Sequence, residues 1–320
     1  MMAVFSHLFG REPSRPAPDL LPAIERAING VEPLLKQTGG YPDSYCAPIQ
    51  SALEYAHALA ARLPGPVDIT RESYAGDPLV HALFPSLESV TDALGNSLAL
   101  QNHLREFPAD ADVYALMGMR RIEKAVAGMR LTGEVVQHDV MQNMVYFTSH
   151  TIESTAASEA EARELVAMSF FDRLVGKVAQ RIAKRKQEKL ALLQEKDTLM
   201  ARLHTADEDS RPALQEQLTR LMADLQDAIG ALELDRYQED FVAVLLDPVP
   251  HLHLIQTAIR LDSMGIRRDN AGEAHGETVV FDDLIGYDRR NWTVTMVHCS
   301  DLQYEEFSSR LERAYRTLTV

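Results

Sequence analysis

The chain has 320 residues, of which 46% are hydrophobic and 25% charged, a composition typical of a globular protein with two or three packed units. A net charge of -15 argues against general nucleic-acid binding, because neutralising phosphates requires a basic surface. No apolar run approaches the roughly 18–20 residues of a transmembrane helix. The two cysteines lie far apart and in no motif, which favours a cytoplasmic protein with free thiols.

Residues 1–18 are expected to form a flexible tail, because three prolines follow a short apolar tip. The tip contains Val4, Phe5, Leu8 and Phe9. Such a tip either docks on a partner, dips weakly into a membrane surface, or is simply a frayed terminus.

Residues 19–156 are predicted to form a helical bundle. Apolar residues recur there at spacings of three and four, and Gly- and Pro-rich breaks separate four helical segments. Ser86 is the expected N-cap of the third helix, and the fourth is expected to run from about Asp110 towards Thr148. Short breaks between helices favour an antiparallel arrangement.

Residues 157–247 are predicted to form a coiled-coil helical hairpin. Ser158 and Glu161 have the spacing of a capping box, and the first helix is expected to end near His204. The returning helix has a heptad seam sustained for almost three repeats. That seam consists of Leu214, Leu218, Leu221, Leu225, Ala228 and Leu232. Folding the chain back near residues 208–209 places Leu203, Leu199 and Leu192 opposite Leu214, Leu218 and Leu225, respectively.

The first helix of this hairpin carries a basic run that is unusual in so acidic a chain. The run includes Lys177, Arg181, Lys184, Arg185, Lys186 and Lys189. The same register places Lys184 against Glu233 and Lys177 against Asp240, which favours pairing within the chain. The lysines and arginines of the run outnumber these acids, however. The run is therefore also a candidate partner-binding surface for a phosphate, a lipid headgroup or an acidic protein face.

Residues 248–320 are predicted to form a small α+β module. Its expected elements are a strand with a bulge near Ile255, strands at 278–281 and 292–299, and a C-terminal helix. That last helix would present Leu302, Phe307, Leu311, Tyr315 and Leu318. The predicted fold class is therefore mainly α: a helical bundle plus a long antiparallel coiled-coil hairpin, with this small C-terminal module.

The C-terminal module also holds the candidate metal ligands. His251 and His253 would share one face of a strand, with Asp282 as a further ligand and Asp283, His275 or His298 nearby. The spacing matches no zinc motif, so surface histidines are the alternative. The sequence contains no P-loop, no G-x-G-x-x-G and no G-x-S-x-G, and no cofactor is predicted.

These observations favour a non-enzymatic cytoplasmic scaffold or adaptor, which presents the hairpin to a protein partner or self-associates. A protruding hairpin and the lack of a recognisable catalytic motif are the basis of that prediction. A metal-dependent enzyme of unfamiliar type is one alternative. The other is a peripheral membrane-associated protein that uses Phe5, Leu8 and Phe9 of the tail.

Overall fold

The structure, a computed structural model, describes residues 20–108, 112–132, 135–268, 276–286, 291–300 and 302. It divides into two compact units. Unit 1 comprises Met1–Tyr55 and Phe171–His251, and unit 2 comprises Ala56–Phe170 and Leu252–Val320. Two long helices, α2 (Asp43–Ala61) and α7 (Glu159–Thr205), contribute residues to both units.

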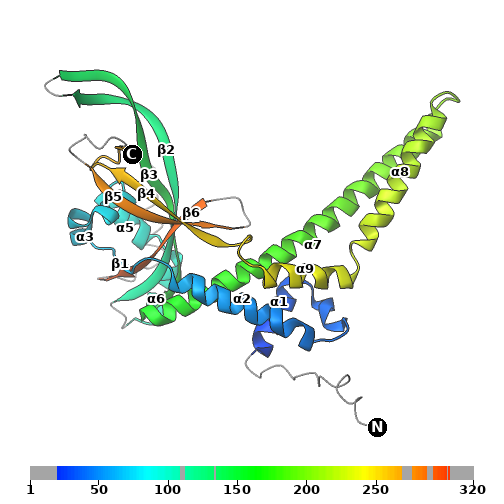
Figure 1. Ribbon diagram of the computed structural model, residues 1–320, viewed down its shortest axis with the longest axis horizontal. Helices are drawn as coiled ribbons and strands as arrows, with labels where there is room; N and C mark the ends of the chain where they lie inside the picture. The colour runs from blue at the N-terminus through cyan, green and yellow to red at the C-terminus, as the bar shows by residue number, and fades with distance from the viewer. Residues whose placement is uncertain are drawn as a thin grey trace, which may run out of the picture. The chain divides into compact units, whose positions relative to one another are not determined.

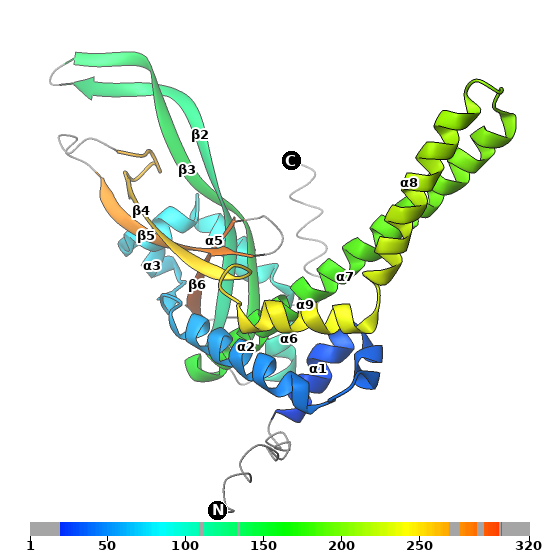
Figure 2. The same cartoon turned by 45° about the vertical axis from the view of Figure 1, so that its right-hand side comes forward.

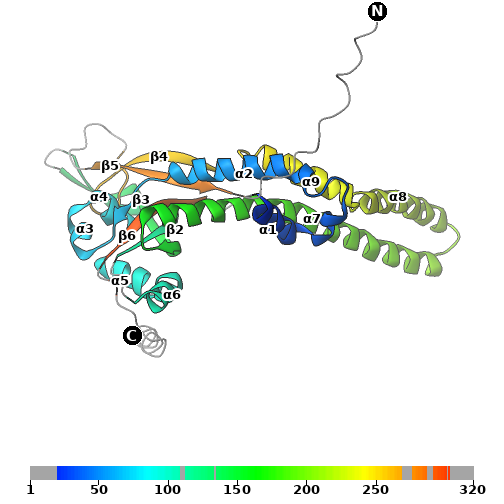
Figure 3. The ribbon, with the colours of Figure 1, turned by 90° about the horizontal axis from the view of Figure 1, so that it is seen from below.

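Unit 1 is helical. Its further elements are α1 (Leu21–Val31), the short 3-10 helix η1 (Pro33–Gln37), α8 (Arg211–Gly230) and α9 (Leu234–Leu246). Apolar residues of α1, including Ile24 and Ile28, are fully buried, and Tyr45 packs edge-on against Phe241 with ring centroids 5.1 Å apart. Beyond this core, α8 runs back alongside α7 as a helical hairpin (Figures 1 and 3).

Unit 2 contains a mixed sheet with helices packed on it. The strands are β1 (Val67–Asp68), β2 (Val113–Thr132), β3 (Val135–Ala156), β4 (His253–Leu261), β5 (Glu277–Ile285) and β6 (Asn291–Cys299). The order is β3-β2-β6-β5-β4 with antiparallel neighbours, and β1 pairs in parallel with β6. Short helices α3 (Arg71–Gly76), α4 (Pro78–Leu83), α5 (Leu87–Gly95) and α6 (Leu98–Glu106) supply the other side of its core.

The packing of β2 on the core of unit 2 accounts for the alternation of its apolar side chains. Val113, Ala115, Met117 and Met119 alternate along β2, and each is fully buried against apolar residues of α4 to α6. Ser86 caps α5, as predicted, by accepting the N–H of Ser89 at 3.2 Å. Past Met119, β2 pairs with β3 but no longer with β6, so the two strands continue as a ribbon (Figures 1 and 2).

The prediction of a mainly α fold is wrong, and β2 and β3 are the reason. The segment expected as one helix from Asp110 towards Thr148 is this long β-hairpin. Three register shifts in the pairing of β2 with β3 each place one extra residue in β3, near the positive-φ residues Asp139, Ser149 and Ser154, and such bulges break the strict alternation of a strand. The apolar residues then recur at mixed spacings, which imitate helical periodicity.

The C-terminal strands also differ from their prediction. They are not a separate module, because β6 pairs with β2 as well as with β5. The expected bulge near Ile255 is absent from the register of β4 with β5, which is continuous from His253 to Leu261. The predicted C-terminal helix lies outside the described residues, apart from Leu302.

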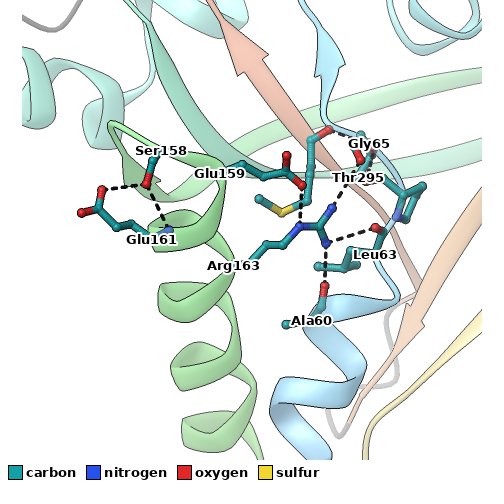
Figure 4. Close-up of polar contacts among 10 residues, drawn as sticks. Ala60, Leu63, Gly65, Ser158, Glu159, Glu161, Arg163 and Thr295 are labelled. Carbon is teal, nitrogen blue, oxygen red and sulfur yellow. Dashed lines mark hydrogen bonds and ion pairs between the residues drawn. The ribbon is translucent and has the colours of Figure 1, made fainter.

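Arg163 ties three segments of unit 2 together (Figure 4). Its guanidinium donates to the carbonyl oxygens of Ala60 at 2.8 Å, Leu63 at 3.2 Å and Gly65 at 3.3 Å, and to Glu159 at 2.7 Å. These carbonyls lie at and just after the C-terminal end of α2, where backbone acceptors have no partner within the helix. The arginine thus satisfies them from the first turns of α7.

A buried ion pair lies at one end of the sheet. The Nη2 atom of Arg121 is 2.8 Å from Asp283 Oδ2, and these side chains are 18% and 6% exposed. Asp283 also accepts hydrogen bonds from Thr293 at 2.6 Å and Thr257 at 3.3 Å. Nη1 of Arg121 is buried without a hydrogen-bond partner. The carboxylate is therefore better satisfied than the cation that it neutralises.

Candidate protein-binding surface on the helical hairpin

The hairpin of α7 and α8 is held together by its own seam. Leu199, Leu214 and Leu221 form a small buried cluster, and Leu192, Leu203 and Leu218 pack against it. The sequence register placed these leucines opposite one another. Spacings of three and four extend the seam to Lys189, Leu192, Lys196, Leu199 and Leu203 on α7, and to Leu214, Leu218, Leu221, Leu225 and Ala228 on α8, all of them buried or half-buried.

The seam divides the rest of the hairpin surface into two flanks. Each residue of a helix is rotated by about 100° from the one before it. Because α7 and α8 run in opposite directions, residues that directly follow a seam residue lie on the same flank for both helices. Residues that directly precede a seam residue lie on the opposite flank.

The residues that follow the seam form what we call the apolar flank. Its large apolar side chains are Leu190, Leu193, Met200, Met222 and Ile229, and its only charged residue is Asp197. Four of these side chains are well exposed: Leu190 by 58%, Met200 by 43%, Met222 by 48% and Ile229 by 50%. Folding of the hairpin therefore leaves this apolar stripe largely uncovered.

The residues that precede the seam form the polar flank. It contains no large apolar residue, and all its positions are exposed. Its charged residues are Glu188, Glu195, Arg202, Arg220, Asp224 and Asp227. The contrast shows that the apolar side chains are concentrated on one side of the hairpin. An apolar patch rimmed by polar residues is typical of a site of interaction.

The two ends of the hairpin differ in charge. At the base, residues 184–189 contain Lys184, Arg185, Lys186 and Lys189 with Glu188 as the only acid. At the tip, Asp207, Glu208 and Asp209 precede Arg211. Hydrogen bonds from Ser210 lower the pKa of Asp207, so its carboxylate is ionised at neutral pH. The hairpin is therefore basic at its base and acidic at its tip.

The chain itself supplies partners for much of the basic run. Arg185 and Arg181 lie 2.8 Å and 3.6 Å from carboxylate oxygens of Asp240, and Lys186 lies 3.0 Å from Glu32. A hydrogen bond with Glu32 raises the pKa of Lys186.

The expected pairs of Lys184 with Glu233 and of Lys177 with Asp240 do not form. Lys184 lies 3.6 Å from Glu188, and Lys177 donates to Gln180 at 3.3 Å. The reason is that α8 ends at Gly230 and α9 begins only at Leu234, which shifts the register. Lys189 is half-buried in the seam.

The structure does not bring the predicted metal ligands together. His251 lies in a turn before β4, so it does not share a strand face with His253. In the register of β4 with β5, His253 faces Ile285, whereas Asp282 faces Gln256, three residues further along β4. Within the described residues, no three His, Cys, Asp or Glu side chains gather as a metal site requires.

The surroundings of His251 and Asp282 shift the pKa values of both side chains. Burial and the nearby cations Arg181 and Lys177 lower the pKa of His251, and the same cations would repel a metal ion there. Burial raises the pKa of Asp282, against a hydrogen bond from Gln256 and the charge of Arg62.

The tail residues Phe5, Leu8 and Phe9 lie outside the described residues, as does His275. None of the described helices is long and apolar enough to cross a membrane. Both cysteines are free: Cys46 is half-buried and Cys299 is buried.

Sequence reasoning missed the apolar flank. The signal lies in the residues that directly follow each seam residue, and it becomes visible only when the seam is assigned. Comparison with known proteins supplies no further guide, because no family model, curated protein or solved structure matches this chain.

Proposed function

We propose that this chain is a non-enzymatic cytoplasmic scaffold or adaptor whose α7–α8 hairpin binds a protein through its apolar flank. The observation that carries the proposal is the asymmetry between the flanks. The buried cluster between the two helices consists of seam leucines, and no residue of the apolar flank belongs to it. Leu190, Met200, Met222 and Ile229 nevertheless expose apolar surface on one side only.

A protein fits this flank better than a membrane surface does. Helices that lie in a membrane interface usually carry Lys and Arg on their polar face, which attract anionic lipids. Here the polar flank contains four acids and two arginines, and the tip adds Asp207, Glu208 and Asp209. Methionine is also a common residue at protein-binding surfaces, because its flexible side chain adapts to the partner. Two of the five large apolar residues of the flank are methionines.

The test compares the two flanks in a capture experiment. Tagged full-length chain would be used to capture protein from its native host, with the bound proteins quantified by mass spectrometry. The double variant Met200→Glu/Met222→Glu adds two charges to the apolar flank. The matched control Thr198→Glu/Gln217→Glu adds the same charge to exposed positions of the polar flank, on the same two helices.

We expect a stoichiometric protein to bind the wild-type chain and the control, and to be lost from the apolar-flank variant. Equal capture by the two variants would show that the flank is not the binding surface. Flotation of the wild-type chain with liposomes, abolished by the same variant, would instead show that the flank binds a membrane.

A further inference from the structure

We infer that the occupant of the apolar flank is the apolar flank of a second copy of this chain, with the two hairpins side by side and antiparallel. The inference rests on the proposed function and names the partner. It follows from three features of the hairpin: where charge is missing, how charge is distributed along its length, and how the apolar side chains lie about its midpoint.

The absence of charge on the flank is the first feature. The whole chain carries a net charge of -15, so copies repel one another over most of their surfaces. On the apolar flank only Asp197 is charged. Two copies can therefore approach through this flank with less repulsion than through the polar flank, where four acids lie.

The distribution of charge along the hairpin selects the orientation. A parallel pair would place the two acidic tips, Asp207–Asp209, together and the two basic ends, residues 184–189, together. An antiparallel pair places the basic end of each copy, where the Lys184 and Lys186 side chains are 76% and 50% exposed, beside the acidic tip of the other. Charges that approach to within the screening length, about 8 Å at physiological salt, attract one another, so these ends favour the antiparallel orientation.

The central apolar side chains of α7 fit a two-fold axis near Asp197. In an antiparallel pair centred there, Leu193 of each copy lies opposite Met200 of the other, and the contact occurs twice. Within one hairpin, Arg220 of α8 lies at the same level as Asp197 of α7. The axis therefore passes α8 near Arg220, and Met222 of one copy lies close to Thr219 of the other. An isologous contact of this kind closes as a dimer and does not propagate.

Asp197 itself is the unfavourable element of this arrangement, since the two copies of it lie near the axis. Its side chain is 75% exposed and lies 3.4 Å from Lys196, so water and that lysine reduce the repulsion. Removal of the charge should therefore strengthen the dimer.

The size of the flank sets the expected strength. From Leu190 to His204 the flank extends about 21 Å at 1.5 Å per residue, and two helix axes lie about 8–10 Å apart. Each copy would then bury on the order of 400 Å², and the pair on the order of 800 Å², which is the range of weak and transient interfaces. The dimer should therefore be concentration-dependent.

The experiment is sedimentation velocity of the full-length chain from about 1 to 200 µM, a range that suits a weak interface. We expect the wild-type chain and the Thr198→Glu/Gln217→Glu control to pass from monomer to dimer with the same dissociation constant. Met200→Glu/Met222→Glu should weaken the dimer at least about tenfold, and Asp197→Asn should strengthen it severalfold. Circular dichroism of each variant checks that helix content is retained.

Cysteine cross-linking tests the axis independently. In a Cys46→Ser background, which leaves only the buried Cys299, Asp197→Cys should form a covalent dimer when a mild oxidant such as diamide is added. Glu195→Cys, on the polar flank, should remain monomeric. Equal cross-linking of both positions would overturn the two-fold axis near residue 197.

The outcomes separate this inference from the proposed function. A wild-type chain that stays monomeric throughout, yet loses a different captured protein on Met200→Glu/Met222→Glu, refutes self-association and leaves the proposed function intact. A wild-type dimer that both variants leave unchanged also refutes the inference, because another surface then forms it. A monomer that captures nothing refutes both.

Discussion

The buried pair of Arg121 and Asp283 should behave as a coupled unit in unit 2. Removal of one charge from a buried pair leaves the other charge uncompensated, which typically costs 3–5 kcal/mol, although both can often be replaced together at little cost. In Asp283→Ala, the Arg121 side chain is 18% exposed and keeps a contact of 3.5 Å from its Nε to Glu123 Oε1, so water and this carboxylate relieve part of the penalty. We therefore expect Asp283→Ala to lower the free energy of unfolding by about 3 kcal/mol.

Replacement of Arg121 should lower the free energy of unfolding by less than replacement of Asp283. In Arg121→Met the Asp283 carboxylate keeps its hydrogen bonds from Thr293 and Thr257, at 2.6 Å and 3.3 Å. We expect a loss of about 2 kcal/mol, because hydrogen bonds to a charged group recover part of its desolvation cost. The double variant Arg121→Met/Asp283→Leu should lose less than the sum of the single variants by about 2 kcal/mol or more.

Trp292 makes this measurement selective. It is the only tryptophan of the chain, and it directly precedes Thr293 on β6, in the same unit as the ion pair. Urea unfolding followed by its fluorescence therefore reports on unit 2, even if the two units unfold separately and the whole chain is not two-state. Additive losses in the double variant, or a loss below about 1 kcal/mol for Asp283→Ala, would refute the assignment of a buried coupled pair.

Three further predictions concern single side chains. Arg163→Ala should lower the stability of unit 2 by about 2–3 kcal/mol and Arg163→Lys by less, because loss of the guanidinium removes a donor from the carbonyl oxygens of Ala60, Leu63 and Gly65. Trp292 fluorescence measures the change, and equal losses for the two variants would contradict this. Burial raises the pKa of Cys299 to about 12, so a thiol reagent at pH 8 should label it only after denaturation; rapid native labelling would exclude that burial. Burial raises the pKa of Asp282, so its ionised form opposes folding at neutral pH and the penalty disappears as pH falls below the unfolded value. Asp282→Asn should therefore stabilise the chain at pH 7 but not at pH 3 in thermal unfolding, and a constant difference between these pH values would refute it.

The sequence predicts the hairpin well and the β-ribbon badly, for different physical reasons. Leu214, Leu218, Leu221 and Leu225 repeat without interruption, and each contact of the seam joins residues close to a single turn. β2 pairs along its length with the neighbouring strand β3, but each register shift places an extra residue in β3, near Asp139, Ser149 and Ser154, and disrupts the alternation that would have marked that strand. Over Val113–Met119, β2 also pairs with β6, about 180 residues later in the chain. Local periodicity carries no information about such a distant partner.

The candidate site was accessible from sequence only through the seam. The basic run stands out because charge is easy to count, yet Arg181, Arg185 and Lys186 contact carboxylates of their own unit. The apolar flank is inconspicuous because its side chains are separated by three or more residues and lie on two helices. The residues that follow the seam positions can be recognised as one surface only after the seam is assigned.

Because the seam between α7 and α8 is complete within one chain, the apolar residues beside it need an explanation of their own. In a helix that packs on a larger core, an apolar residue beside the seam widens the buried stripe and needs no further explanation. In this hairpin the opposite flank is polar at equivalent positions, which shows that two packed helices do not require apolar flanks. Leu190, Met200, Met222 and Ile229 expose apolar surface at a cost in water, and none of them belongs to the buried leucine cluster of the seam. Burial against another hairpin recovers that cost, and it does so only when the two chains meet.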